Sequence, residues 1–331
     1  MLAACGNGVA TTTVGQTPTS IDTVTSTEPD AAAVLDIQGH RGARGLQPEN
    51  TLPAFETALD LGVTTLELDL HFTADGQIVV WHDPIVHPDK CRLDSDASLS
   101  GPDLGEANET DIRIAGFSRA DLMAYRCDKN PDENRFPNQL PTPTAIAGDS
   151  YQIVTLDQLF DFVAEYATSD LKTPEQKAAA TNVRFNVETK RDPDRPETIN
   201  DGFDGTSPGP FELALLALIE DHGLSNRVVV QSFDHRSLRA IRSQDPAIRL
   251  AALTSRNVPF GADFADFADI WSPDYRSLSA SSLEAAHAAG LQVIPWTVNE
   301  PADMTRLIDL GVDGLISDRP DLLVALVPAG P

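Results

Sequence analysis

The chain has 331 residues, enough for one large domain or two of ordinary size. Hydrophobic residues make up 41% and charged residues 22%, which is typical of a soluble globular protein with ample material for a core. The formal net charge of -26 argues against nucleic-acid binding, because a phosphate backbone would be repelled. No stretch contains the roughly 18–20 consecutive apolar residues that span a bilayer. An anionic substrate would therefore have to be held locally, by a metal ion and a few cationic side chains.

Strands and helices are predicted to alternate along most of the chain. The signals are clear at the first helix, where Asn50 and Thr51 precede Pro53 and Gly62 follows. The turn at 74–76 is too short for a helical crossover, so the two strands beside it break the regular repeat. In chain order, the predicted strands are 34–39, 64–70, 77–82, 183–188, 227–232, 249–253, 269–271, 292–297 and 312–317. The helices after the first are predicted at 156–167, 211–222, 234–243, 260–267, 279–289 and 301–309.

This alternation predicts an α/β fold, a (β/α)8 TIM barrel at 34–325, with a C-terminal tail at 326–331. A loop-rich insertion is expected after the third strand, at about 85–151, where Pro, Asp, Gly and Asn replace the apolar pattern. Nine strands are predicted, whereas such a barrel has eight, so one predicted strand is extra or peripheral. An open doubly wound sheet is the alternative. The barrel is favoured because polar residues follow many successive strands, as a barrel rim requires.

Two carboxylates stand two residues apart in a predicted strand. Glu67 and Asp69 alternate with leucines, so both project from the same face. In such apolar surroundings water cannot relieve their repulsion cheaply, whereas a hard divalent cation can. Glu188 ends another strand and would supply a third carboxylate. The absence of a His/Cys cluster beside them disfavours zinc, so the set predicts a Ca²⁺ or Mg²⁺ site.

Histidines and cations accompany these carboxylates. His40 follows one strand and His82 ends another, so both can reach the same rim and serve as a general base and a general acid. Arg41 can clamp phosphate oxygens with its planar guanidinium, and Lys190 would project beside Glu188 as a second cation. The histidines that have no such carboxylates and cations beside them are interpreted as structural or exposed, namely His71, His87, His222, His235 and His287.

The first residues, MLAAC, resemble the end of a bacterial lipoprotein signal, whose lipobox is a Leu-Ala-Ala/Gly-Cys pattern. Residues 6–33 are rich in Thr, Ser and Ala and lack apolar periodicity, which is typical of a flexible tether. We therefore expect an exported protein, periplasmic or lipid-anchored at the cell envelope, with a membrane tether through Cys5. In such a protein the even pair Cys91 and Cys127, both within the insertion, is expected to form a disulfide.

The order of motifs between residues 36 and 325 resembles that of the glycerophosphodiester phosphodiesterase family. The motifs are HRG at 40–42, PENT at 48–51, ELD at 67–69, DG at 75–76, HD at 82–83, NVETK at 186–190, QSF at 231–233, WTVN at 296–299 and DGLISD at 313–318. The combination is far more specific than any one motif.

The resemblance implies a barrel enzyme that hydrolyses glycerophosphodiesters to glycerol 3-phosphate and an alcohol. It implies that His40 and His82 are the acid–base pair, that Arg41 and Lys190 contact the phosphate, and that Trp296 lines the glycerol pocket. The implied metal ligands are Glu67, Asp69 and Glu188.

Other functions stay open at this stage. The same barrel could support a lysophospholipase D or a phospholipase-like phosphodiesterase, and a non-catalytic phosphodiester-binding lipoprotein is a further alternative. The expected partner is a small-molecule glycerophosphodiester, with neither nucleic acid nor a protein partner inferred. The sequence leaves open which head group is preferred and whether the metal ion is Ca²⁺ or Mg²⁺. It also leaves open whether water or a substrate hydroxyl is the nucleophile, which histidine acts first, and what the oligomeric state is.

Overall fold

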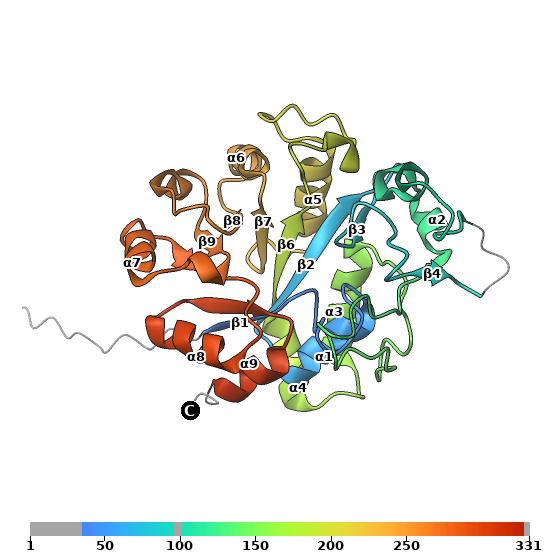
Figure 1. Ribbon diagram of the computed structural model, residues 1–331, viewed down its shortest axis with the longest axis horizontal. Helices are drawn as coiled ribbons and strands as arrows, with labels where there is room; N and C mark the ends of the chain where they lie inside the picture. The colour runs from blue at the N-terminus through green and yellow to red at the C-terminus, as the bar shows by residue number, and fades with distance from the viewer. Residues whose placement is uncertain (1–34, 96–100, 328–331) are drawn as a thin grey trace, which may run out of the picture. The chain divides into compact units, whose positions relative to one another are not determined.

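The computed structural model describes residues 35–95 and 101–327. In this part of the chain, parallel strands form a nearly closed barrel in the order β10-β9-β8-β7-β6-β2-β1-β11, with helices outside it (Figure 1). The barrel prediction is confirmed, and the doubly wound alternative is wrong. The barrel strands are β1 (Asp36–Gly39), β2 (Thr65–Phe72), β6 (Arg184–Thr189), β7 (Val228–Ser232), β8 (Arg249–Thr254), β9 (Ile270–Pro273), β10 (Gln292–Val293) and β11 (Gly314–Ser317).

Strands from the two ends of the chain close the barrel. β1 pairs with β11 along its whole length, with Gly39 opposite Ser317. On the far side of β11, the Asp313 N–H donates to the Val293 carbonyl (3.0 Å) and the Ile316 N–H to that of Pro295 (3.1 Å). The strand predicted at 292–297 is therefore regular only over β10, yet the backbone beyond it still bonds to its neighbour.

The helices include two that apolar periodicity does not reveal. α4 contains mostly small and polar residues, and its start is set by a capping box between Thr173 and Gln176. α9 follows the last strand, where no helix is predicted. The segment predicted as a helix at 260–267 is instead a 3₁₀ helix, Ala262–Asp266. The helices are α1 (Leu52–Leu61), α2 (Arg119–Leu122), α3 (Leu156–Thr168), α4 (Pro174–Asn182), α5 (Pro210–Asp221), α6 (His235–Gln244), α7 (Ala280–Ala288), α8 (Pro301–Leu310) and α9 (Pro320–Leu326).

Alternation along β2 separates the core from the site. Leu66, Leu68 and Leu70 are fully buried in the main apolar core. Glu67 and Asp69 project from the opposite face, because side chains alternate along a strand. The two carboxylates are held by the packing of the leucines between them.

The loop between β1 and α1 is shaped by backbone conformations that few residues adopt. Gly42 has φ of 83°, and a Cβ there would lie 2.6 Å from the Ala54 backbone. Arg41 also lies in the left-handed region, with φ of 52°. Thr51 then caps α1, and Gly62 ends it with φ of 81°. The tight loop directs Arg41 back toward β2.

The extra strand candidate is β3 (Ile78–Val80), which pairs antiparallel with β2 in a hairpin. The segment after it contains the short strands β4 (Arg92–Leu93) and β5 (Tyr125–Arg126) and lies beside β2 and β3 (Figure 1). Its apolar side chains form a separate small core around Trp81 and Tyr125. The segment lacks an apolar pattern along its sequence, but its few apolar residues gather in one cluster.

The structure joins Cys91 to Cys127 by a disulfide next to the β4–β5 pair. Cys5 and the tether predicted at 6–33 lie outside the described residues, as does the end of the tail at 328–331. Among the residues that are described, no helix is both long and apolar enough to cross a membrane.

Candidate active site

A cavity of about 490 Å³ lies at the carboxyl ends of the barrel strands. It is the expected place for a site in this fold, because the loops after the strands meet there. Most of the residues predicted from sequence line it, namely His40, Arg41, Glu67, His82, Glu188, Lys190 and Trp296. Asp69 is fully buried beneath its wall.

The three predicted metal ligands come together through strand register. Asp69 on β2 pairs directly with Glu188 on β6, and Glu67 stands on the same face as Asp69. One oxygen from each carboxylate lies within 4.8 Å of the others. Amides orient two of the groups: Gln231 Nε2 donates to Glu67 Oε1 (2.7 Å), and Asn50 Nδ2 donates to Asp69 Oδ2 (2.9 Å).

The electrostatics of this trio fit a divalent cation. Burial and the neighbouring Asp69 charge raise the pKa of Glu67 well above its usual value, and burial raises the pKa of Glu188 to about 7. Asp69 Oδ1 is buried without a hydrogen-bond partner. A cation would satisfy this oxygen and favour the ionised form of all three groups, and an all-oxygen donor set suits a hard ion.

His40 is held from behind by the end of the last barrel strand. Its Nδ1 lies 2.6 Å from Asp318 Oδ1, because β1 and β11 are paired and these residues follow them. Arg44 donates to both oxygens of the same carboxylate, at 2.7 and 3.0 Å, and Asn299 donates to it at 2.8 Å. Burial, reinforced by Arg44, lowers the pKa of His40 to about 4. With Nδ1 engaged, Nε2 lies 3.8 Å from Glu67 and is the nitrogen near the acidic trio.

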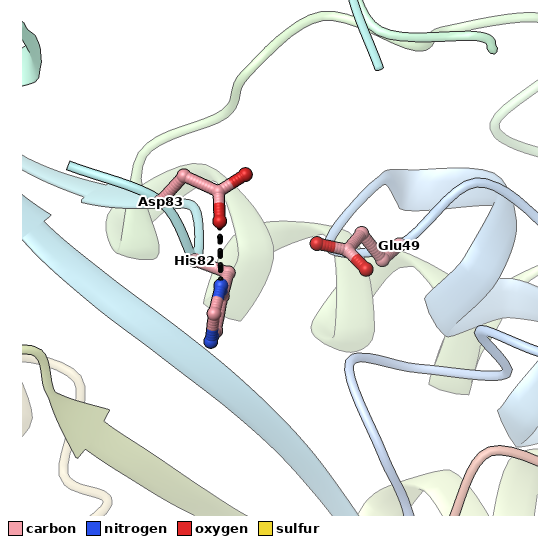
Figure 2. A group of neighbouring side chains, drawn as sticks. All are labelled: Glu49, His82 and Asp83. Atoms are coloured by element: carbon pink, nitrogen blue, oxygen red, sulfur yellow. Dashed lines mark hydrogen bonds and ion pairs between the residues drawn. The ribbon is translucent and has the colours of Figure 1, made fainter. Parts of the chain in front are cut away.

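His82 has a parallel arrangement on the other side of β2. It follows β3, and its Nδ1 lies 2.8 Å from Asp83 Oδ1, with Glu49 near both (Figure 2). Burial and the positive charges of Arg41 and Lys190 lower its pKa to about 3. Both histidines are therefore bound to a carboxylate through Nδ1 and can use Nε2 for proton transfer.

The two predicted phosphate ligands are positioned by the same carboxylates. Arg41 Nη1 donates to Glu49 (2.9 Å), and its Nε lies 3.0 Å from Asp69 Oδ2. Lys190 donates to Glu188 (2.8 Å) and lies 3.5 Å from Asp69 Oδ1. Both cations also line the cavity, so their charge is available to an anion there.

An aromatic wall completes the cavity. Trp296 donates its indole N–H to the Ser272 carbonyl (3.0 Å) and packs edge-to-face on Phe233, with ring centroids 5.4 Å apart. Fixing the indole N–H leaves apolar ring surface beside the charged groups.

Comparisons with known proteins identify the family of the chain. The model of the glycerophosphoryl diester phosphodiesterase family matches residues 40–322, most of the chain. The chain belongs to this family. A glycerophosphodiester phosphodiesterase from Caldanaerobacter subterraneus subsp. tengcongensis is 27% identical over 88% of the chain and 97% of its own length.

Solved structures show the same fold. A Silicibacter pomeroyi protein, assigned to the glycerophosphoryl diester phosphodiesterases, matches with a TM-score of 0.69 and 27% identity, over 88% of this chain and 92% of that one. An Oleispira antarctica phosphodiesterase, solved in complex with the product sn-glycerol-3-phosphate, matches with a TM-score of 0.61 at 18% identity, over 87% of this chain and 94% of that one.

Several residues in and around this cavity are missed by sequence reasoning. Asp83 and Asp318 each follow a predicted strand directly, a position that could have drawn attention to them. Glu49 is part of a recognised motif but has no predicted role. Lys90 has no sequence signal, because it lies in the irregular insertion. His87, interpreted as structural or exposed, is half-exposed and lines the cavity.

We expect Asp318→Asn to destabilise the fold by about 3–5 kcal/mol at neutral pH, because the buried Arg44 guanidinium loses the carboxylate that it binds through two hydrogen bonds and keeps only Glu49 at 3.5 Å. Cations and the His40 hydrogen bond hold the pKa of Asp318 well below its usual value despite burial. The contribution of Asp318 to the free energy of unfolding is therefore complete above pH about 4 and is lost as the pH falls further. Urea unfolding at several pH values measures it.

Asp321→Asn is the control, since Asp321 pairs with Arg319 at 2.7 Å in a more exposed position and should contribute about 0–1 kcal/mol. Equal effects of the two variants at neutral pH would contradict the role assigned to Asp318.

Proposed function

We propose that the enzyme hydrolyses glycerophosphodiesters to glycerol 3-phosphate and an alcohol, with a divalent metal ion and the His40/His82 pair. The observation that carries the proposal is the convergence of two carboxylate-bound histidines, two cations and three metal-type carboxylates on one cavity. The product complex of the Oleispira antarctica relative supports the substrate class.

The phosphate of the substrate would lie between Arg41 and Lys190. Both cations line the cavity while bound to buried carboxylates, so they are already oriented when the substrate arrives. The aromatic pair Phe233 and Trp296 offers an apolar surface for the carbon chain of the glycerol arm. We assign the metal to Glu67, Asp69 and Glu188; when bound, a Ca²⁺ or Mg²⁺ ion supplies further positive charge for the phosphoryl oxygens.

The two histidines would divide the proton transfers. Each is neutral at neutral pH, because burial lowers its pKa, so either ring can accept a proton from the nucleophile. An anionic phosphodiester beside the second ring favours its imidazolium form, which allows it to protonate the departing oxygen. Asp318 binds Nδ1 of His40, and Asp83 binds Nδ1 of His82. Nε2 is therefore the nitrogen that would transfer the proton in both rings.

Metal dependence is tested by chelation and by Glu67→Gln. With glycerophosphocholine as substrate and released glycerol 3-phosphate as the readout, EDTA should abolish activity, and Ca²⁺ or Mg²⁺ should restore it. Glu67→Gln should lower kcat by about 10²-fold or more and weaken metal binding measured by calorimetry. Glu175→Gln, an exposed glutamate of α4, is the matched control. Full activity of the chelated enzyme would refute the metal proposal.

The acid–base assignment is tested by alanine variants of His40 and His82. Each should lower kcat by about 10²- to 10⁴-fold, the usual contribution of general acid–base catalysis. The double variant should lose less than the product of the two factors, because the groups act in one reaction. His287→Ala, an exposed histidine bonded to Asp313, should keep wild-type kcat. A histidine whose alanine variant retains wild-type kcat has no catalytic role.

We also propose that the protein is exported and anchored through Cys5, with residues 6–33 as the tether. The support is the LAAC string, the Thr/Ser-rich stretch and the Cys91–Cys127 disulfide, which suits an oxidising compartment. Radiolabelled palmitate should label the full-length protein in the membrane fraction, and Cys5→Ala should abolish the label. Recovery of unlabelled wild-type enzyme in the cytosol would refute the proposal.

A further inference from the structure

Glu49, His82 and Asp83 form a second cluster of metal-type ligands beside the acidic trio. Their ligand atoms lie within 4.8 Å of one another. Figure 2 shows the Asp83 carboxylate directed at the His82 ring, with Glu49 approaching from the β1–α1 loop. Two carboxylates at this distance require a countercharge, particularly since Glu49 is buried.

That countercharge is Lys90. Its Nζ donates to Glu49 Oε1 (2.8 Å) and to Asp83 Oδ2 (2.5 Å), bridging the two carboxylates. The side chain is only 13% exposed, and the ammonium lies 5.7 Å from the centre of the Trp81 ring. An ammonium ion thus bridges two carboxylates that a second metal ion would otherwise have to bridge.

We propose that Lys90 is a positioning residue of the reaction, which replaces a second metal ion in this cluster and is held in place by the Cys91–Cys127 disulfide. This inference rests on the proposed function, because it concerns the groups that perform it. It assigns a role in that function to Lys90, a residue of the insertion, and to the disulfide beside it.

Lys90 contacts one carboxylate that orients the acid–base residue His82 and another that orients the phosphate ligand Arg41. Through Asp83 it fixes the carboxylate that holds His82 Nδ1 (2.8 Å). Through Glu49 it fixes the carboxylate to which Arg41 Nη1 donates (2.9 Å). Without the ammonium ion, the two carboxylates would repel each other and turn away from His82 and Arg41. The acid–base group and the phosphate ligand would then lose their orientation together.

The disulfide supports this flexible side chain from its backbone. A lysine has four rotatable side-chain bonds, so its ammonium is placed well only when its Cα is fixed. Lys90 directly precedes Cys91, and its carbonyl accepts the Lys129 N–H (3.1 Å). On the Cys127 side of the disulfide, the Cys127 N–H donates to the Tyr151 carbonyl (2.8 Å). The disulfide ties the two segments together at the residue next to Lys90.

The role of the charge is tested with Lys90→Met, Lys90→Arg and Lys90→Ala. Lys90→Met should lower kcat for glycerophosphocholine by about 10- to 100-fold, as removal of an orienting partner usually does, with a smaller change in KM. Lys90→Arg should retain more activity. n-Propylammonium chloride should partly restore Lys90→Ala, whereas sodium chloride of equal ionic strength should not. Lys177→Met, on α4 away from the cavity, is the matched control.

Wild-type kcat in Lys90→Met would overturn the proposal, and so would an ammonium ion that restores nothing to a folded Lys90→Ala. Circular dichroism and thermal unfolding establish that each variant is folded. A wild-type enzyme that releases no glycerol 3-phosphate would instead refute the proposed function, so the two failures are distinguishable.

The role of the disulfide is tested by a double-mutant cycle. In oxidised protein, with the bond verified by thiol titration, the Cys91→Ser/Cys127→Ser variant should lower kcat several-fold. The same change in the Lys90→Met background should lower it no further, because the disulfide acts through Lys90. An equal loss in both backgrounds, or no loss in the first, would show that the disulfide does not position Lys90.

Discussion

Compensation of buried negative charge is the constraint on which this site depends. Asp69 is fully buried between two other carboxylates, yet its pKa lies well below the usual value, because Arg41 and other positive groups outweigh the effect of burial. The same cations line the cavity. Arg41 and Lys190, which help to hold Asp69 ionised, are thus also available to an anionic substrate. Although the net charge of the chain is -26, an anion can be held here because five cationic side chains line the cavity, namely Arg41, Arg44, Lys90, Arg135 and Lys190.

Parallel strand pairing turns distant sequence positions into neighbours. The register between β2 and β6 places Asp69 opposite Glu188, and that between β1 and β11 places His40 beside Asp318. His40, Glu188 and Lys190 stand at or just after the carboxyl ends of their strands, and the tight β1–α1 loop adds Arg41 to them. The leucines of β2 and the cap of α1 contribute indirectly, by fixing where those strand ends lie.

The segment after β3 adds to the barrel without changing it. It has its own small apolar core and its own disulfide, while its residues Ile146 and Ala147 pack against the barrel core. Yet it contributes Lys90, His87, Arg135 and Phe136 to the cavity wall. Its own apolar cluster and disulfide thus support a segment that reaches into the cavity.

The amino-acid sequence by itself determined the barrel, the acidic trio and the two histidines. These follow from local patterns: alternation places Glu67 and Asp69 on one face, and polar residues at strand ends mark the rim. The sequence could not reveal α4, whose start depends on capping and not on apolar periodicity, or the true extent of β10. Nor could it reveal that Asp318 holds His40, or that Lys90 bridges Glu49 and Asp83. These pairs join residues far apart in the chain or inside an irregular segment, where no periodic pattern fixes the direction of a side chain. Only strand closure and the packing of the insertion brought those charges within hydrogen-bond distance.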